Sequence, residues 1–231
     1  MREREVLIKA CRILAEQRLI RATEGNLSLR EEDEVIITPT GVRKAELEVK
    51  DLSVIDLDGN HLEGPRPSSE YRLHLEIYKR RPDVNAIVHA HPEFAAALSI
   101  AGVSLEFPVL SEAVAYLGPV PSVPHALPST QDLAVMTAEY AKKYDGLLLS
   151  NHGAVTVGHD VNFALYLMEI LEYTARVFYR ALLLGRVHLL TKQEVEKLLE
   201  IRQKSYRLPP RDWSLDDFKW DLSEIMEKGL L

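Results

Sequence analysis

Short apolar runs alternate with amphipathic stretches along most of this chain, and this alternation constrains the fold more than any other feature. Brief runs rich in Val, Ile and Leu are typical of buried strands, whereas apolar residues repeated at three- and four-residue intervals are typical of helices. Several strand-like runs are separated by only a few turn residues, which favours hairpins. The pattern predicts a single α/β domain with a mixed, largely antiparallel central sheet flanked by helices.

These periodicities also place the individual elements. Helices are expected at 2–19, 68–80, around 94–98, 129–143, 161–184 and 192–205. Strands are expected at 27–30, 35–38, around 54–55, 86–91, 107–110, 120–123, 146–150 and 154–157. Residues 1–207 are expected to form the domain, and 208–231 a tail that docks on the body or on a neighbouring subunit. Cys11 lies on the apolar stripe of the first helix, so we expect a buried core residue.

The composition excludes several classes of protein. Hydrophobic residues make up 46% of the chain and charged residues 27%, which fits a globular protein and not a disordered chain. The net charge of −7 argues against nucleic acid as a partner, because binding to a phosphate backbone needs clustered Lys and Arg. We find no apolar run long enough to span a membrane and no secretory signal, so we expect a cytoplasmic protein without a membrane partner.

Three histidines and one carboxylate form a candidate metal site. His89 and His91 are two residues apart at the end of a strand, so their side chains point to the same side. Such a pair can converge on one metal ion, although two polar histidines at a strand end are an equally ordinary pattern. His152, in the turn after another apolar strand, favours the metal site, because zinc sites commonly use three protein ligands. Glu70 offers a fourth ligand or an acid/base group, although an acidic residue early in a helix is also favoured by the helix dipole.

The other histidines show no such pattern. We expect surface or structural roles for four of them: His61, His125, His159 and His188. His74 lies one helical turn after Glu70. A packing role on the helix face is the expectation for His74, and support of the site is the alternative.

A second group of residues has small hydrogen-bond donors at turns and element ends. Its members are Gly25, Asn26, Thr40, Gly41, Ser68 and Ser69. Exposed N–H and hydroxyl groups of this kind can hold a phosphate without a basic patch. Each also has an ordinary explanation as a turn glycine, a loop asparagine or a helix cap.

Together these motifs resemble the class II aldolase/epimerase superfamily, which includes the adducin head domain. The resemblance covers about residues 5–205 and is nearest to the L-fuculose-1-phosphate aldolase branch. It is carried by five motifs in order: Gly25-Asn26-Leu-Ser28, Ile37-Thr-Pro-Thr-Gly41, Pro67-Ser-Ser-Glu70, His89-Ala-His91 and Asn151-His-Gly153. The epimerase branch has Asp at the position of Glu70, so the glutamate favours an aldolase or a dehydratase.

The resemblance implies a metal-dependent catalytic domain over 1–207 and a cyclic homotetramer with active sites between adjacent subunits. It implies one Zn²⁺ per subunit, held by His89, His91, His152 and Glu70. Mn²⁺, Co²⁺ or Fe²⁺ would fit the same ligands. It further implies that Glu70 acts as acid/base and that the small-donor group holds the phosphate of a small sugar substrate.

The expected reaction is the reversible cleavage of a small ketose 1-phosphate, such as L-fuculose 1-phosphate. The products are dihydroxyacetone phosphate and an aldehyde, formed through an enediolate that a divalent cation stabilises. The family aldolase has a catalytic Tyr where this chain has Ser111 or Glu112, and we expect Tyr116 or another group to take its place on the substrate side. The resemblance implies a second Tyr near the C-terminus, to which Tyr206 corresponds. The alternatives are a dehydratase of the methylthioribulose-1-phosphate type, a pentulose-phosphate epimerase and a non-catalytic adducin-like interaction module.

Overall fold

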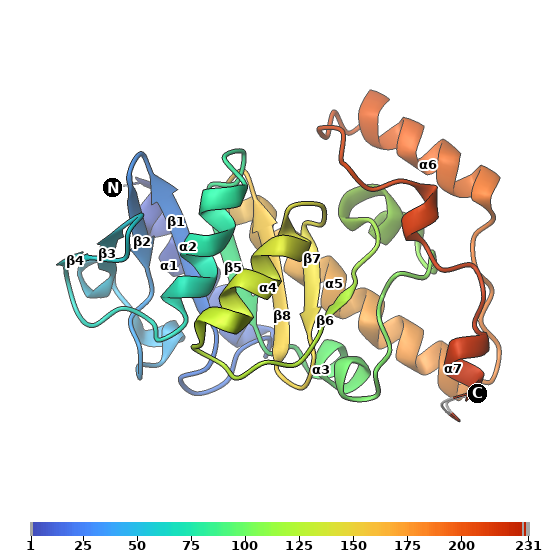
Figure 1. The fold of residues 1–231 in the computed structure, drawn as a ribbon, viewed down its shortest axis with the longest axis horizontal. Helices are drawn as coiled ribbons and strands as arrows, with labels where there is room; N and C mark the ends of the chain where they lie inside the picture. Colours follow the sequence, from blue (N-terminus) through green and yellow to red (C-terminus); the bar gives the residue numbers. More distant parts are fainter. Residues whose placement is uncertain (1, 228, 230–231) are drawn as a thin grey trace.

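One sheet forms the centre of the molecule in the computed structural model, which describes residues 2–227 and 229. Its eight strands have the order β4-β3-β2-β1-β5-β8-β7-β6 (Figure 1). Neighbouring strands pair antiparallel throughout, except that β6 and β7 are parallel. The mixed, largely antiparallel sheet expected from the sequence is therefore confirmed. The strands are β1 (Asn26–Glu31), β2 (Glu34–Ile37), β3 (Ser53–Asp56), β4 (His61–Glu63), β5 (Ala86–Ala90), β6 (Ser122–Val123), β7 (Gly146–Leu149) and β8 (Gly153–Gly158).

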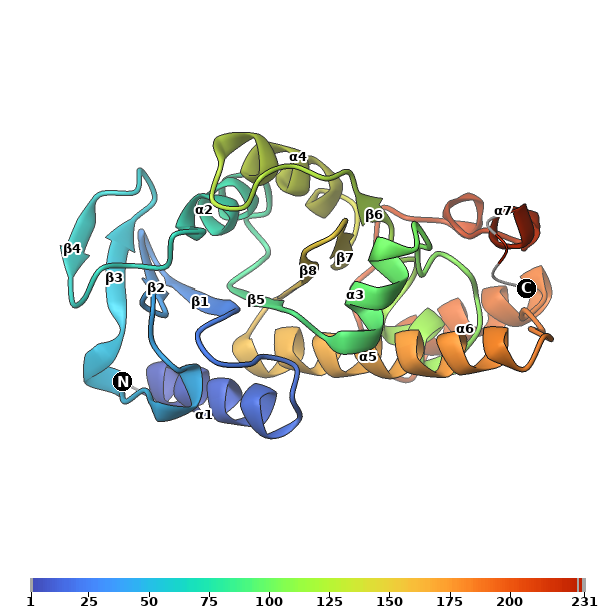
Figure 2. The ribbon, with the colours of Figure 1, turned by 90° about the horizontal axis from the view of Figure 1, so that it is seen from below.

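Helices cover both faces of this sheet. Figure 2 shows α1 and α5 below the strands and α2 and α4 above them. The helix α3 packs against α5 and belongs to the lower layer. The helices are α1 (Arg2–Glu16), α2 (Tyr71–Arg80), α3 (Glu93–Ile100), α4 (Gln131–Ala141), α5 (Val161–Leu183), α6 (Lys192–Lys204) and α7 (Ser223–Glu227). A π-helical turn occupies Ala113–Leu117.

The central strand β5 is buried on both faces because helices cover it from both sides. Its side chains alternate between the two hydrophobic layers: Val88 packs in the layer of α1 and α5, and Ile87 in the layer of α2 and α4. Alternation places His89 on the same side as Ile87, facing α2. Cys11 is fully buried in the layer of α1, as the apolar stripe of that helix predicts.

Several elements differ from their predicted bounds. The first helix ends at Glu16 and not at residue 19, because Arg18 takes a left-handed backbone conformation (φ 61°). No strand forms at 107–110: Pro108 has no N–H to donate to a ladder, and the ring of Phe107 packs against Phe178 instead. The strand expected at 120–123 shortens to Ser122–Val123.

Two further differences concern hairpins and caps. The strand β4 was not expected, because all three of its residues are exposed and its sequence lacks an apolar signal. A turn at Asp58-Gly-Asn60 pairs it with β3, and the Asp56 carboxylate accepts a hydrogen bond from the Asn60 N–H at 2.8 Å. The helix α2 begins at Tyr71 and not at Ser68, so Glu70 is its N-cap residue and not a residue inside the helix.

The C-terminal segment lies against the π-helical turn and α6. Trp213 and Phe218 are buried there, in a small hydrophobic cluster with Val114 and Val195. Within the described residues, none of the helices is both long enough and apolar enough to cross a lipid bilayer.

Candidate metal centre

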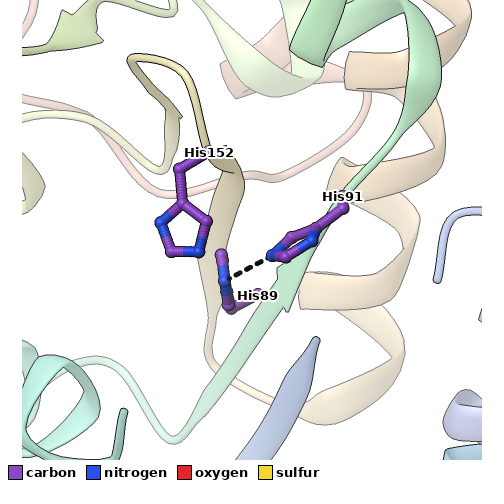
Figure 3. Close-up of side chains that lie close together, drawn as sticks. All are labelled: His89, His91 and His152. Atoms are coloured by element: carbon purple, nitrogen blue, oxygen red, sulfur yellow. Dashed lines mark hydrogen bonds between the residues drawn. The ribbon is translucent and has the colours of Figure 1, made fainter. Parts of the chain in front are cut away.

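Three histidines meet at the end of the central strands. His89 lies in β5, His91 follows that strand directly, and His152 lies in the turn between β7 and β8. One ring nitrogen from each lies within 4.8 Å of the other two. Figure 3 shows the three rings converging from these two segments of the chain. The structure thus brings together the histidines that the strand spacing and the turn motif predicted.

The turn that carries His152 depends on a glycine. Strand β8 pairs with β5, which brings the β7–β8 turn against the end of β5. A Cβ atom at Gly153 would lie 2.4 Å from the Ala90 carbonyl oxygen and 2.7 Å from Cδ2 of His91. Asn151 adopts a left-handed conformation (φ 56°), which Asn tolerates better than most residues. Only glycine at position 153 lets His152 approach the other two histidines in this way.

The hydrogen bonds of the rings indicate where their free nitrogens point. Nδ1 of His89 donates to the Ala154 carbonyl oxygen at 3.0 Å, and Nδ1 of His91 donates to Oε2 of Glu24 at 3.0 Å. In the neutral rings the protons are therefore on Nδ1, and the lone pairs are on Nε2. The two Nε2 atoms lie 3.2 Å apart. Two lone pairs facing each other at this distance fit a shared cation.

Glu70 completes the donor set from the opposite helix. As the N-cap residue of α2, it places Oε2 3.2 Å from Nε2 of His89 and Oε1 3.5 Å from Nε2 of His152. Oε1 is buried without a hydrogen-bond partner. Three imidazole nitrogens and a carboxylate oxygen fit a first-row divalent metal such as Zn²⁺.

Electrostatics in the cluster keep the carboxylate charged and two histidines neutral. Burial disfavours the charged forms of Glu70 and His89, but their mutual attraction outweighs this effect. The pKa of Glu70 is therefore held well below its usual range, and the pKa of His89 is raised. Burial, followed by the charge on His89, lowers the pKa of His91 and brings the pKa of His152 to about 4. Neutral imidazoles beside a carboxylate are the protonation states that metal binding needs.

The three segments with small hydrogen-bond donors (25–26, 40–41 and 68–69) lie side by side next to the histidine cluster. The Thr40 N–H donates to the Arg66 carbonyl at 3.2 Å, and the Ser68 N–H to the Thr38 carbonyl at 3.1 Å. Thr38 also accepts from the Leu27 N–H through its hydroxyl, which joins these loops to β1. In this set Gly25, Asn26 and Ser68 are buried, Thr40 is half-buried, and Gly41 and Ser69 are exposed.

The two tyrosines lie together at another place. The rings of Tyr116 and Tyr206 stack with centroids 4.7 Å apart, and Tyr166 contacts Tyr116. Tyr116 is half-buried, whereas Tyr206 is 44% exposed. Neither tyrosine hydrogen-bonds with His89, His91 or His152 within the described part of the chain.

The sequence pattern does not point to Glu24, and for His74 it favours packing over support of the site. Glu24 holds His91, but no spacing rule connects the two residues, and only the pairing of β1 with β5 brings them together. His74 is fully buried and hydrogen-bonds with Asn26, so it does more than pack. Its position one turn after Glu70 was the available signal. The other four histidines (His61, His125, His159 and His188) are exposed, as expected.

Comparison with known proteins agrees with this architecture. Residues 5–179 match the family described as "Class II Aldolase and Adducin N-terminal domain". The chain is 33% identical over 201 residues to the 5-deoxy-D-ribulose 1-phosphate aldolase of Bacillus thuringiensis, covering 85% of this chain and 93% of the relative. It is 33% identical over 205 residues to the L-fuculose phosphate aldolase of Escherichia coli, covering 87% and 94%.

A solved structure shows the same likeness. The L-fuculose-1-phosphate aldolase of Thermus thermophilus has a TM-score of 0.72 and 36% identity, covering 80% of this chain and 98% of that one. Class II aldolases are metal-dependent, and the three-histidine group of this chain can bind a metal. The chain belongs to the class II aldolase and adducin N-terminal domain family and is an enzyme of the class II aldolase type.

Proposed function

We propose that this enzyme is a Zn²⁺-dependent aldolase that cleaves a small ketose 1-phosphate to dihydroxyacetone phosphate and an aldehyde. The observation that carries the proposal is the convergence of three imidazole nitrogens and the charged Glu70 carboxylate on one point. The names of the two relatives support the substrate class, because both act on a sugar phosphate. L-fuculose 1-phosphate is therefore the first substrate to test.

Each group has a chemical role in this proposal. His89, His91 and His152 hold the metal, with Glu70 as a further ligand. The bound metal would act as a Lewis acid that polarises the substrate carbonyl. Glu70 moves a proton at the carbon of the donor substrate next to the bond that breaks or forms. Gly25, Asn26, Thr40, Gly41, Ser68 and Ser69 hold the phosphate and so fix the orientation of the substrate. Thr40 and Ser68 use their hydroxyl groups, because their N–H groups already donate to carbonyls.

The proposal also includes a homotetramer in which Tyr116 and Tyr206 act at the site of a neighbouring subunit. Their stacked rings reach the surface and do not contact the histidines of their own chain. The long helix α5 exposes Tyr166 and Tyr173 by 46 and 54%, and its C-cap residue Leu184 is 83% exposed. Large exposed apolar side chains along one helix support an interface between subunits.

Proton exchange tests the chemistry before the aldehyde is known. The metal-loaded enzyme is incubated with dihydroxyacetone phosphate in D₂O, and the carbon-bound protons are followed by NMR. We expect stereospecific loss of one proton, abolished by a chelator and restored by Zn²⁺. No exchange by fully metal-loaded protein would exclude dihydroxyacetone phosphate as the donor and would favour a sugar-phosphate dehydratase instead.

A further inference from the structure

A continuous chain of buried hydrogen bonds runs from Glu70 into the layer between the sheet and α2. Nδ2 of Asn26 donates to Oε2 of Glu70 at 2.9 Å, and Oδ1 of Asn26 lies 2.5 Å from Nε2 of His74. Nδ1 of His74 lies 2.6 Å from the Ser28 hydroxyl, which lies 2.7 Å from the Tyr78 hydroxyl. The side chains of these four residues, Asn26, His74, Ser28 and Tyr78, are each at most 3% exposed.

The chemistry of the end groups fixes the direction of every hydrogen bond. Glu70 is a carboxylate and can only accept, so the Asn26 amide must present its NH₂ group to Glu70 and its oxygen to His74. An amide oxygen also only accepts, so the proton of His74 is on Nε2. Nδ1 then accepts from the Ser28 hydroxyl, and the Ser28 oxygen accepts from the Tyr78 hydroxyl.

The Asn26 amide is held at both ends, by Glu70 at its NH₂ group and by His74 at its oxygen. The backbone of Asn26 is held by the pairing of β1 with β5, where it lies opposite His89. Its side-chain amide can still turn over, because the oxygen and nitrogen ends have nearly the same shape. A turned amide would present its oxygen to the Glu70 carboxylate. The N–H of His74 prevents this, because the turned amide would place a second donor against it. Burial lowers the pKa of His74 to about 3, so the ring stays neutral and keeps an acceptor for Ser28.

We propose that His74 is a positioning residue that holds the Asn26 amide so that its NH₂ group fixes the Glu70 carboxylate beside the metal histidines. The proposal deepens the proposed function, because it assumes that Glu70 is the acid/base group of the aldolase. Ser28 and Tyr78 support His74, because the Ser28 hydroxyl bonds to Nδ1 of the ring and is itself held by the Tyr78 hydroxyl. The role differs from packing, since it depends on one N–H and one ring nitrogen and not on the volume of the ring.

Two substitutions separate these roles. His74→Phe keeps a buried ring but removes both hydrogen-bonding groups, whereas His74→Gln keeps one donor and one acceptor. The control is Ile77→Ala, which removes a fully buried side chain from the same helix outside the hydrogen-bonded chain. We expect His74→Phe to lower kcat for proton exchange at least about tenfold, with little change in KM and Zn²⁺ still bound. His74→Gln should recover most of kcat, and Ile77→Ala should lower the melting temperature and leave kcat unchanged.

The tautomer of His74 provides a readout that does not depend on activity. Two-bond ¹H–¹⁵N spectra of the ¹⁵N-histidine-labelled holoenzyme, assigned with His74→Gln, should show a neutral ring protonated at Nε2. A ring protonated at Nδ1 would overturn the proposal, as would equal kcat losses in the Phe and Gln variants or none in the Phe variant. If His74→Phe fails to fold, the Gln variant and the wild-type spectrum still decide. If the wild-type enzyme shows the Nε2 tautomer but exchanges no proton, the proposed function fails and the placement of Asn26 stands.

Discussion

Glu24 contacts the metal centre only through another residue, and this makes its contribution measurable. It accepts the Nδ1 proton of His91 and so leaves Nε2 of that ring free for a metal. We expect Glu24→Ala to weaken Zn²⁺ affinity about 10- to 100-fold, as is usual when the hydrogen-bond partner of a metal-binding histidine is lost. Competition with a chromophoric chelator would measure the affinity.

A nearby carboxylate provides the control for this change. Glu93 pairs with Arg21 on the surface, and its side chain is 67% exposed. Glu93→Ala removes the same charge without touching a histidine, so its Zn²⁺ affinity should match that of the wild type. Equal losses in the two variants would mean that charge alone acts, and the role of Glu24 as the partner of His91 would be wrong.

Substituting Glu70 should affect proton exchange more than metal content, because Glu70 is proposed both as a ligand and as the proton carrier. Glu70→Gln keeps the shape and one oxygen donor but removes the basic carboxylate. We expect the variant to keep its metal, measured by elemental analysis, and to lose proton exchange with dihydroxyacetone phosphate by at least about 100-fold. Exchange at the wild-type rate would remove Glu70 from the proton transfer.

How much of the candidate site the sequence predicts depends on how local the signal is. The spacing of His89 and His91 places both on one side of a strand, and the structure brings them together with His152 and Glu70. The place of Glu24 could not be predicted, because it depends on strand pairing between residues far apart in sequence. The hydrogen bonds of His74 depend in the same way on how α2 lies over β1.

At the scale of elements, the β7–β8 turn determines how close His152 comes to its partners. Gly153→Ala would place a methyl group against the Ala90 carbonyl and the His91 ring. We expect a loss of about 1–3 kcal/mol in the free energy of unfolding. We also expect weaker Zn²⁺ binding, since the ring of His91 must move. Thermal unfolding of the metal-free protein and chelator competition measure the two effects separately.

Gly185 offers a matched control outside the site. It has a φ of 75°, and a Cβ there meets nothing within 4 Å. Gly185→Ala should therefore lower the free energy of unfolding by about 1 kcal/mol through backbone strain, and it should leave the Zn²⁺ affinity unchanged. Unchanged Zn²⁺ affinity in Gly153→Ala as well would show that the turn does not set the position of the histidines.

The elements themselves were predicted best where the periodic signal was long. The expected 161–184 helix corresponds closely to α5, whose apolar face packs along the sheet. The strand expected at 107–110 does not form, because Phe107 is buried and Val109 and Leu110 are half-buried in a loop. A loop that buries apolar side chains has the same composition as a strand. The strand β4 carries no apolar signal at all, since it is exposed at the edge of the sheet.

At the scale of the whole molecule, Asp217 links the C-terminal segment to the body. Its carboxylate accepts hydrogen bonds from Lys143 at 2.5 Å, from the Tyr144 hydroxyl at 2.7 Å and from the Ser214 N–H at 2.7 Å. Burial opposes ionisation of Asp217, but these partners outweigh it and lower its pKa below the ordinary 3.8. The link is therefore complete above about pH 4 and is lost as the pH falls through the lowered pKa.

This link predicts acid-dependent release of the segment that carries both tryptophans. We expect the fluorescence of Trp213 and Trp220 to shift towards that of exposed indole below pH 4, before the sheet unfolds by circular dichroism. Asp217→Asn should weaken the contact by up to about 1 kcal/mol at neutral pH and remove this acid step. An unchanged acid step in Asp217→Asn would assign it to another carboxylate.

Assembly is the last property that the surface of a single chain suggests. If Tyr116 acts at the site of a neighbouring subunit, a Tyr116→Phe chain and a Glu70→Gln chain each lack a different half of the same site. We expect each variant alone to be impaired and a co-expressed mixture to regain activity, because some sites then receive both intact halves. Light scattering should give four times the chain mass of 26.2 kDa. A monomer, or a mixture no more active than its components, would confine each site to one chain and leave the Tyr116–Tyr206 stack with a structural role.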